Sequence, residues 1–319
     1  MREQEHNPKP RSATIVVFML AVLVVSVVVA WWISHHRQTA VRRGGEIVAE
    51  IRRDGLKKFW GEGTREFFLV RRNGLDVGWH AALRKPVEGG YRGLDVYMHL
   101  ASPGADQWES WTLSDDLRAG TYRAFGPSRL MKDRWARTEI ALAHGHVTVT
   151  ETQFALARAS RAGGVAMMRE MDTFTSRAAV GENYLPEGTL PLVLRQVGEH
   201  QVTASFKIIL NEMPPMPTAS GEWETRFGSI RAEFGGQETL ANPAPTRTTV
   251  VTAVRGGFGH DSTERTYWSQ DGTLQRLTAG PMEFVRVDQA ELLKVFPKAI
   301  EELNALTKHP DTGYDSTEE

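Results

Sequence analysis

Hydrophobic residues follow two patterns along this chain, one continuous and one alternating. The continuous pattern is the run from Thr14 to Ile33, TIVVFMLAVLVVSVVVAWWI, which contains no charged side chain. At a rise of about 1.5 Å per residue, a helix of this length spans about 30 Å, the hydrocarbon thickness of a bilayer. The run therefore predicts a transmembrane helix at 14–33, behind a polar N-terminal tail at 1–13.

A buried core helix and a cleaved signal peptide are the alternatives for such a run. No small-x-small cleavage site follows it closely, which favours a retained signal anchor. The run ends at Trp31 and Trp32, and an indole at a bilayer surface buries its ring while its N–H stays hydrated. We expect both tryptophans, with Arg37, Arg42 and Arg43, at the membrane interface.

The stretch after the run, 34–62, is predicted to be a juxtamembrane helix or linker. Between Val41 and Phe59, apolar residues alternate with basic ones at helical spacing, although Gly44 and Gly45 weaken the start. Two interpretations stay open. The arginines either contact lipid phosphates, or they face solvent on a stalk that leaves the bilayer.

Beyond Gly63 the apolar residues recur at every second position, the period of half-buried strands. Asn73-Gly74 is a hairpin signal, because both residues tolerate the positive φ of a tight turn. The pattern predicts strands near 67–72, 76–83, 91–100, 108–113, 121–125, 137–142, 146–152, 165–172, 202–210, 225–234, 248–254 and 264–268. We expect a mainly β (α+β) fold over 63–287, a strongly curved antiparallel sheet or half-barrel with few helices.

Two segments interrupt the alternation. The segment Asn183–Val197, NYLPEGTLPLVLRQV, is predicted to connect two halves of the β region that meet near 181–200, and whether they form one sheet or two is left open. Helical spacing over 288–306, interrupted at Pro297, predicts a C-terminal helix. The final residues, 307–319, have the composition of a disordered tail.

Several stretches resemble poorly characterised bacterial envelope proteins: NGLDVGWHAALRK, WESWTLSDDLRAGTYRAF, ENYLPEGTLPLVLRQV, and TYWSQDGTLQRL before MEFVRV. The fold of those proteins is related to the lipoprotein-carrier (LolA-like) half-barrel, so the resemblance implies a curved sheet around helices and an apolar cavity over about 67–288. The chain departs from such carriers in keeping a spanning helix, and from lipoproteins in lacking a lipidated cysteine.

The charges that flank the apolar run leave its orientation open. Three basic residues precede the run and seven follow closely, so the positive-inside rule alone places the rest of the chain in the cytoplasm. Long domains translocate despite such charge, and the resemblance is to envelope proteins. We therefore favour a single-pass inner-membrane protein with its bulk in the periplasm, with a cytoplasmic bulk as the alternative.

The composition argues against several kinds of functional site and does not indicate one. A net charge of −1 argues against nucleic-acid binding, and the lack of cysteine excludes disulfides and thiolate chemistry. The chain has no Walker A, G-x-S-x-G or H-E-x-x-H motif, so we expect neither an enzyme nor a cofactor. His144 and His146 in AHGHVTVT have the spacing of metal ligands, but Gly145 indicates a turn, and no metal site is predicted.

Tryptophans are the remaining signal for a binding site. Trp108 and Trp111 stand three apart, so on a regular strand one faces an interior while the other faces outward. We predict that Trp79, Trp108, Trp111 and Trp268 line a site for an apolar ligand such as a lipid or acyl chain. The alternative is a non-enzymatic scaffold that binds another envelope protein.

Overall fold

The computed structural model describes residues 11–61, 63–100, 107–127, 134–156, 168–209, 216–217, 223–225, 227–241, 245–256 and 262–308. One antiparallel sheet of 14 strands dominates it, beside a small sheet of β10 and β11. The strands are β1 (Arg65–Arg72), β2 (Leu75–Pro86), β3 (Arg92–Leu100), β4 (Gln107–Leu113), β5 (Gly120–Pro127), β6 (Arg134–Ala143), β7 (His146–Leu156), β8 (Met168–Ala179), β9 (Thr203–Ile209), β10 (Met216–Pro217), β11 (Trp223–Glu224), β12 (Phe227–Leu240), β13 (Thr246–Gly256), β14 (Ser262–Ser269), β15 (Leu274–Ala279) and β16 (Met282–Val287). The helices are α1 (Arg11–Asp54), α2 (Lys57–Trp60), η1 (Glu88–Gly90), η2 (Glu187–Thr189), α3 (Leu190–Glu199), α4 (Gln289–Val295) and α5 (Ala299–Lys308).

The first and last strands of the large sheet are neighbours in its middle rather than at its edges. Its order is β8-β7-β6-β5-β4-β3-β2-β1-β16-β15-β14-β13-β12-β9, so β1 and β16 lie side by side and β8 and β9 form the two edges. The mainly β, antiparallel fold class predicted from the alternation is confirmed. The segment 181–200 does not divide the β region into two sheets, because it connects the two edges of one continuous sheet.

The β1–β2 hairpin shows how local sequence directs this meander. Asn73 has a φ of 53° and Gly74 a φ of 80°, the positive values that the Asn-Gly pair tolerates. Strands β15 and β16 had not been predicted individually. In β15 the leucines Leu274 and Leu277 are three residues apart, which hides the period of two.

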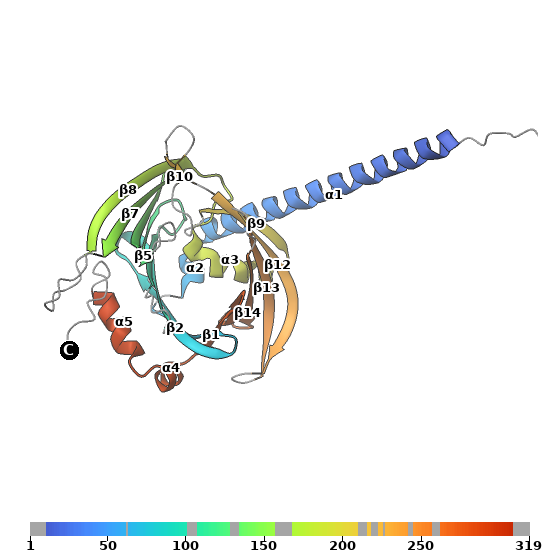
Figure 1. The fold of residues 1–319 in the computed structure, drawn as a ribbon. Helices are drawn as coiled ribbons and strands as arrows, with labels where there is room; N and C mark the ends of the chain where they lie inside the picture. Colours follow the sequence, from blue (N-terminus) through green and yellow to red (C-terminus); the bar gives the residue numbers. More distant parts are fainter. Residues whose placement is uncertain are drawn as a thin grey trace, which may run out of the picture.

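The sheet curls around three helical segments, and its concave face forms the main core with them. Figure 1 shows α2 and α3 between the wall that contains β5 and β7 and the wall that contains β12, β13 and β14. In α3, Leu192, Val193 and Val197 are buried in the same cluster as Phe206 and Ile230 of the sheet. The leucines of the predicted connection therefore belong to a helix that lies inside the curved sheet.

Helix α1 has an exposed half and a buried half. Among the described residues it is the one helix long and apolar enough to cross a membrane, and its apolar window is exposed. From Ala40 onward the helix enters the domain, where Ile47, Val48 and Ile51 are buried in the main core. The apolar face of this half packs against β9 and α3, and whether its arginines contact lipid stays a prediction. Figure 1 shows one unbroken helix projecting from the domain.

The C-terminal helices cover part of the convex face. Leu292 of α4 and Leu303 of α5 pack with Phe67, Leu69 and Trp79. The predicted helix at 288–306 is two helices, since proline at 297 cannot continue the backbone hydrogen bonds of the first. The predicted tails fall at 1–13 and 307–319, of which 1–10 and 309–319 lie outside the described residues.

Two adjacent glycines in α1 provide a matched test of how the helix docks. A Cβ on Gly44 would lie 2.0 Å from the carbonyl oxygen of Ser205 in β9, whereas a Cβ on Gly45 would meet nothing within 4 Å. We expect Gly44→Ala to lower the free energy of unfolding by about 1–3 kcal/mol through overpacking. Gly45→Ala should raise it by up to about 1 kcal/mol through helix propensity. Denaturant unfolding of the full-length protein measures both, and equal stability of the two variants would disprove this docking.

Candidate ligand cavity

A cavity of about 400 Å³ lies inside the curved sheet. Strands β1 to β7 and β13 to β16 contribute to its wall, and η2, α3 and Trp60 contribute from the helical side. Much of the lining is apolar, as with Leu94 and Val96 of β3 and Leu192 and Leu194 of α3. Pockets that hold small ligands have this volume and this mixture of apolar walls with a few polar groups.

Two close contacts fix the helical side of the cavity. Gly188 of η2 lies against Trp111, and a Cβ at this position would come within 2.6 Å of the indole ring. Only glycine lets the turn approach the tryptophan so closely. Trp60 is buried, and its Nε1 donates a hydrogen bond to the carbonyl oxygen of Gly93 at 3.2 Å.

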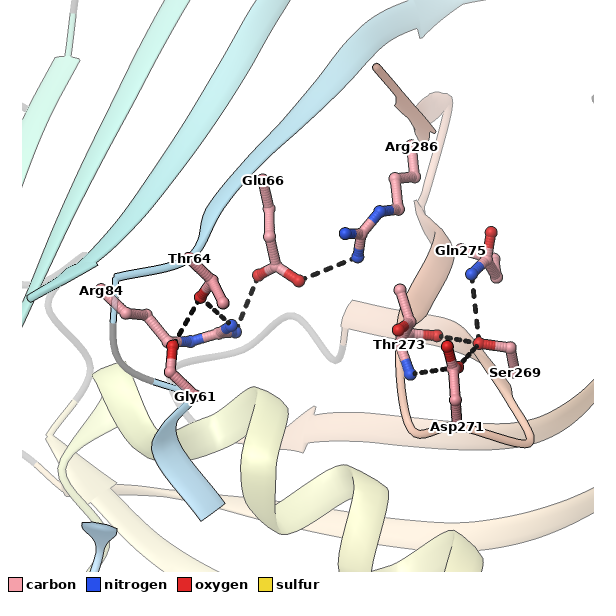
Figure 2. Close-up of polar contacts among 9 residues, drawn as sticks. All are labelled: Gly61, Thr64, Glu66, Arg84, Ser269, Asp271, Thr273, Gln275 and Arg286. Carbon is pink, nitrogen blue, oxygen red and sulfur yellow. Dashed lines mark hydrogen bonds and ion pairs between the residues drawn. The ribbon is translucent and has the colours of Figure 1, made fainter. Parts of the chain in front are cut away.

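A cluster of ion pairs at the wall of the cavity joins three neighbouring strands. Glu66 of β1 pairs with Arg84 of β2 at 2.8 Å and with Arg286 of β16 at 2.9 Å (Figure 2). Arg84 also donates to the hydroxyl of Thr64 at 3.3 Å. Glu66 and Arg84 line the cavity, so the positive charge of Arg84 is already compensated by a carboxylate.

Figure 2 also shows the β14–β15 turn, which contains Ser269, Asp271 and Thr273. The backbone N–H of Thr273 donates to the Asp271 carboxylate at 3.1 Å. A hydrogen bond from the Ser269 hydroxyl is the main reason that the pKa of Asp271 is lowered. These contacts shape a turn and are not part of the cavity lining.

A second ion cluster ties η2 to the sheet. Arg255 of β13 pairs with Glu187 of η2 and, through Nε at 2.7 Å, with Glu264 of β14. Burial lowers the pKa of Arg255, but the two carboxylates outweigh it and raise that pKa overall. All three side chains line the cavity, and the cation is again compensated.

His80 of β2 is one of the uncharged polar groups of the lining. Its ring stands edge-on to Phe68 and Phe284, with centroids 5.5 Å and 5.7 Å away. Its Nδ1 is buried without a hydrogen-bond partner in the described structure. Burial lowers the pKa of His80 to about 4, so the ring is neutral at pH 7.

The four tryptophans that were predicted to line the ligand site do not all lie in the cavity. Trp111 and Trp268 line the cavity with their buried rings. Trp108 borders it, but its ring belongs to the cluster on the convex face, as the three-residue spacing from Trp111 requires. Trp79 does not line the cavity: it packs under the C-terminal helices, and its Nε1 donates to Glu302 at 3.3 Å.

The predicted membrane-interface residues lie along α1. Trp31 and Trp32 are exposed and contact His35 and His36, with ring centroids 5.4 Å and 4.2 Å apart respectively. Arg37 follows on the exposed part of the helix. Arg42 and Arg43 lie where the helix already enters the domain, since Ala40 and Gly44 beside them are buried.

The two histidines considered as metal ligands lie at the β6–β7 turn. His144 has a φ of 51° and Gly145 a φ of 72°, and the Nδ1 of His146 lies 3.1 Å from the carbonyl oxygen of His144. Within the described ranges, no three histidine, aspartate or glutamate side chains gather where they could hold a metal ion.

Sequence reasoning missed the polar lining, although the sequence contained a signal for it. Glu66, His80 and Glu151 each stand in phase with a buried or partly buried apolar neighbour on the same strand, Phe68, Ala82 and Val149 respectively. A polar residue on the apolar side of an alternating strand marks either a satisfied core group or a site.

The fold and the cavity define a class of protein: a half-barrel of one curved antiparallel sheet, with an internal cavity and one long apolar N-terminal helix. No protein-family model matches the chain, and no curated protein does. Among solved structures it is similar to the "Beta-barrel-like Protein of Domain of Unknown Function DUF1849 from Brucella abortus". The TM-score is 0.46 at 10% identity, over 70% of this chain and 95% of that one. A likeness this distant bears on neither the ligand nor the activity of this protein.

The depressed pKa of His80 predicts a loss of stability in acid. The unfolded state binds the proton with a pKa of about 6.5, and the folded state binds it with a pKa of about 4. The contribution of neutral His80 to the free energy of unfolding is therefore complete above about pH 6.5 and is lost as the pH falls towards 4. The shift corresponds to about 3–4 kcal/mol at most. His80→Gln should lose less stability between pH 7 and 4 than the wild type in denaturant unfolding. His146→Gln is the control, and an acid dependence identical in all three proteins would contradict the assignment.

Proposed function

We propose that this protein is a membrane-anchored envelope protein whose β domain binds or shields an apolar ligand, such as a lipid or an acyl chain, without catalysing a reaction. The observation that carries the proposal is the cavity of about 400 Å³ within the curved sheet. Each methylene that leaves water for such a cavity contributes about 0.8 kcal/mol. An acyl chain of about twelve carbons therefore gains on the order of 10 kcal/mol before the cost of its immobilisation.

The anchor part of the proposal is supported by α1. Its exposed apolar stretch includes Phe18, Leu23 and Val28, and Trp31 and Trp32 follow at its end. A monomeric water-soluble protein rarely exposes so large an apolar surface. We place the bulk of the chain in the periplasm of a bacterial inner-membrane protein and keep a cytoplasmic bulk as the alternative.

We further propose that the fold is of the lipoprotein-carrier kind that the sequence resembles. A curved sheet that encloses helices and an apolar cavity is what the lipoprotein-carrier resemblance implied. Since α1 continues from the apolar stretch into the main core, we propose handling of the ligand at the membrane surface rather than transport by a diffusing carrier.

A scaffold that adds a partner strand to the sheet edge is less well supported. The backbone of Leu185 and Asn183 already hydrogen-bonds to Lys207 of the edge strand β9, and α1 packs along the same strand. On the other edge, β8 contacts β11. The neighbours of β9 occupy the positions that β-augmentation would use there, whereas β8 remains an edge strand.

Filling the cavity tests the proposal. Ala124 of β5 lines the cavity, whereas Ala141 of β6 is exposed on the convex face. We expect Ala124→Phe to abolish most of the lipid retained by the full-length protein in native mass spectrometry, because its ring takes up the ligand's space. Ala141→Phe should retain lipid as the wild type does. A wild-type protein that carries no lipid, or equal retention by both variants, would reject the proposal.

The orientation can be tested separately. We expect alkaline phosphatase fused to the C-terminus of the full chain to be active in bacterial cells and a green fluorescent protein fusion at the same position to be dark. The first enzyme requires the oxidising periplasm for its disulfides. The opposite pair of results would place the domain in the cytoplasm and leave the cavity proposal standing.

A further inference from the structure

The register of the sheet places one carboxyl group of the cavity wall in an unusual position. Glu109 of β4, Ala124 of β5, Thr138 of β6 and Glu151 of β7 are successive partners across four strands, and all four line the cavity. They form a transverse row in which acidic residues at the ends flank two smaller side chains. The small side chains leave space beside Glu151 on the concave face.

Among the described residues, no cation compensates the buried carboxyl group of Glu151. Its side chain is 4% exposed, and in the described structure its hydrogen bond comes from the neutral amide of Gln153 at 2.8 Å. The arginines of the lining are different, since Arg84 and Arg255 are each paired with glutamate. Burying an unpaired carboxylate is costly, and burial accordingly raises the pKa of Glu151.

An acceptor without a hydrogen-bond partner lies beside Glu151. Gln153 shares the concave face of β7 with Glu151 and is 0% exposed, and its Oε1 has no hydrogen-bond partner in the described structure. Buried polar groups are nearly always hydrogen-bonded, so an orphaned acceptor next to a buried carboxylate calls for a donor. A group with both a positive charge and several N–H donors meets both needs.

We infer that the ligand of this cavity is an amphiphile with a protonated amine in its head group, which Glu151 binds while the chain lies against Trp111 and Leu192. This inference rests on the proposed ligand-binding function. An ammonium group donates charge-assisted hydrogen bonds to Glu151. An anionic head group finds the lining arginines already paired and meets repulsion from Glu151.

The test compares three amphiphiles that differ in the head group alone. Full-length protein in phosphatidylcholine nanodiscs is titrated with dodecylamine, dodecanol and dodecanoate analogues that carry a photoactivatable diazirine in the chain. Mass spectrometry then quantifies labelling of the peptides that contain Trp111 and Leu192. We expect the amine to half-saturate at a concentration at least about tenfold lower than the carboxylate, the effect of one charge-assisted hydrogen bond.

Two variants test whether the preference for the amine comes from Glu151. We expect Glu151→Gln to reduce the preference for the amine to below about threefold, since the amide keeps the shape but loses the charge. Continued labelling of this variant by the dodecanol analogue shows that its cavity is intact. Glu139→Gln makes the same change on the convex face of the neighbouring strand, where Glu139 pairs with Arg123, and should keep the wild-type preference.

The outcomes separate this inference from the proposed function. Saturable labelling with equal affinity for the three head groups, or a preference for the carboxylate, would overturn the amine inference and leave cavity binding intact. A preference for the amine that persists in Glu151→Gln would likewise overturn the role of Glu151. Absence of saturable labelling by all three amphiphiles would overturn the proposed function together with the inference.

Discussion

The apolar concave face of one strongly curved sheet is the constraint on which this structure depends. A 14-stranded sheet that curls without joining its edges encloses more space than its own side chains fill. Protein interiors pack densely, so that space has to be occupied by other parts of the chain. The end of α1, together with α2 and α3, does so, and the volume that they leave empty becomes the cavity (Figure 1).

This constraint links the N-terminal helix to the body of the protein. Because the second half of α1 is part of the core, the exposed apolar half is rigidly continuous with the domain rather than tethered by a linker. Gly44 allows the helix backbone to approach β9, and Gly188 allows η2 to approach Trp111. Both contacts bring inserted segments closer to the sheet than any side chain would permit.

The polar groups of the cavity follow from the same geometry. Strand alternation directs a few charged side chains to the concave face, where low polarity makes an unpaired charge costly. The clusters around Glu66 and Arg255 solve this by pairing charges from neighbouring strands and from η2. In the part of the chain that the structure describes, Glu151 has no such partner, and His80 remains neutral, so the lining combines paired charges with polar groups that no opposite charge compensates.

The sequence by itself determined what depends on neighbouring residues: the period-two strands, the Asn73-Gly74 turn, the break at Pro297 and the long apolar helix. It also indicated that Trp108 and Trp111 face opposite ways. Only the tertiary structure decided which face is concave. Alternation separates the side chains of a strand into two faces, but it does not indicate which face points to the interior of the sheet. For this reason Trp79 was expected in the cavity and His80 was overlooked, although they are adjacent on one strand. The burial of α3 and of the second half of α1 inside a single sheet was likewise decided by contacts between segments far apart in the chain.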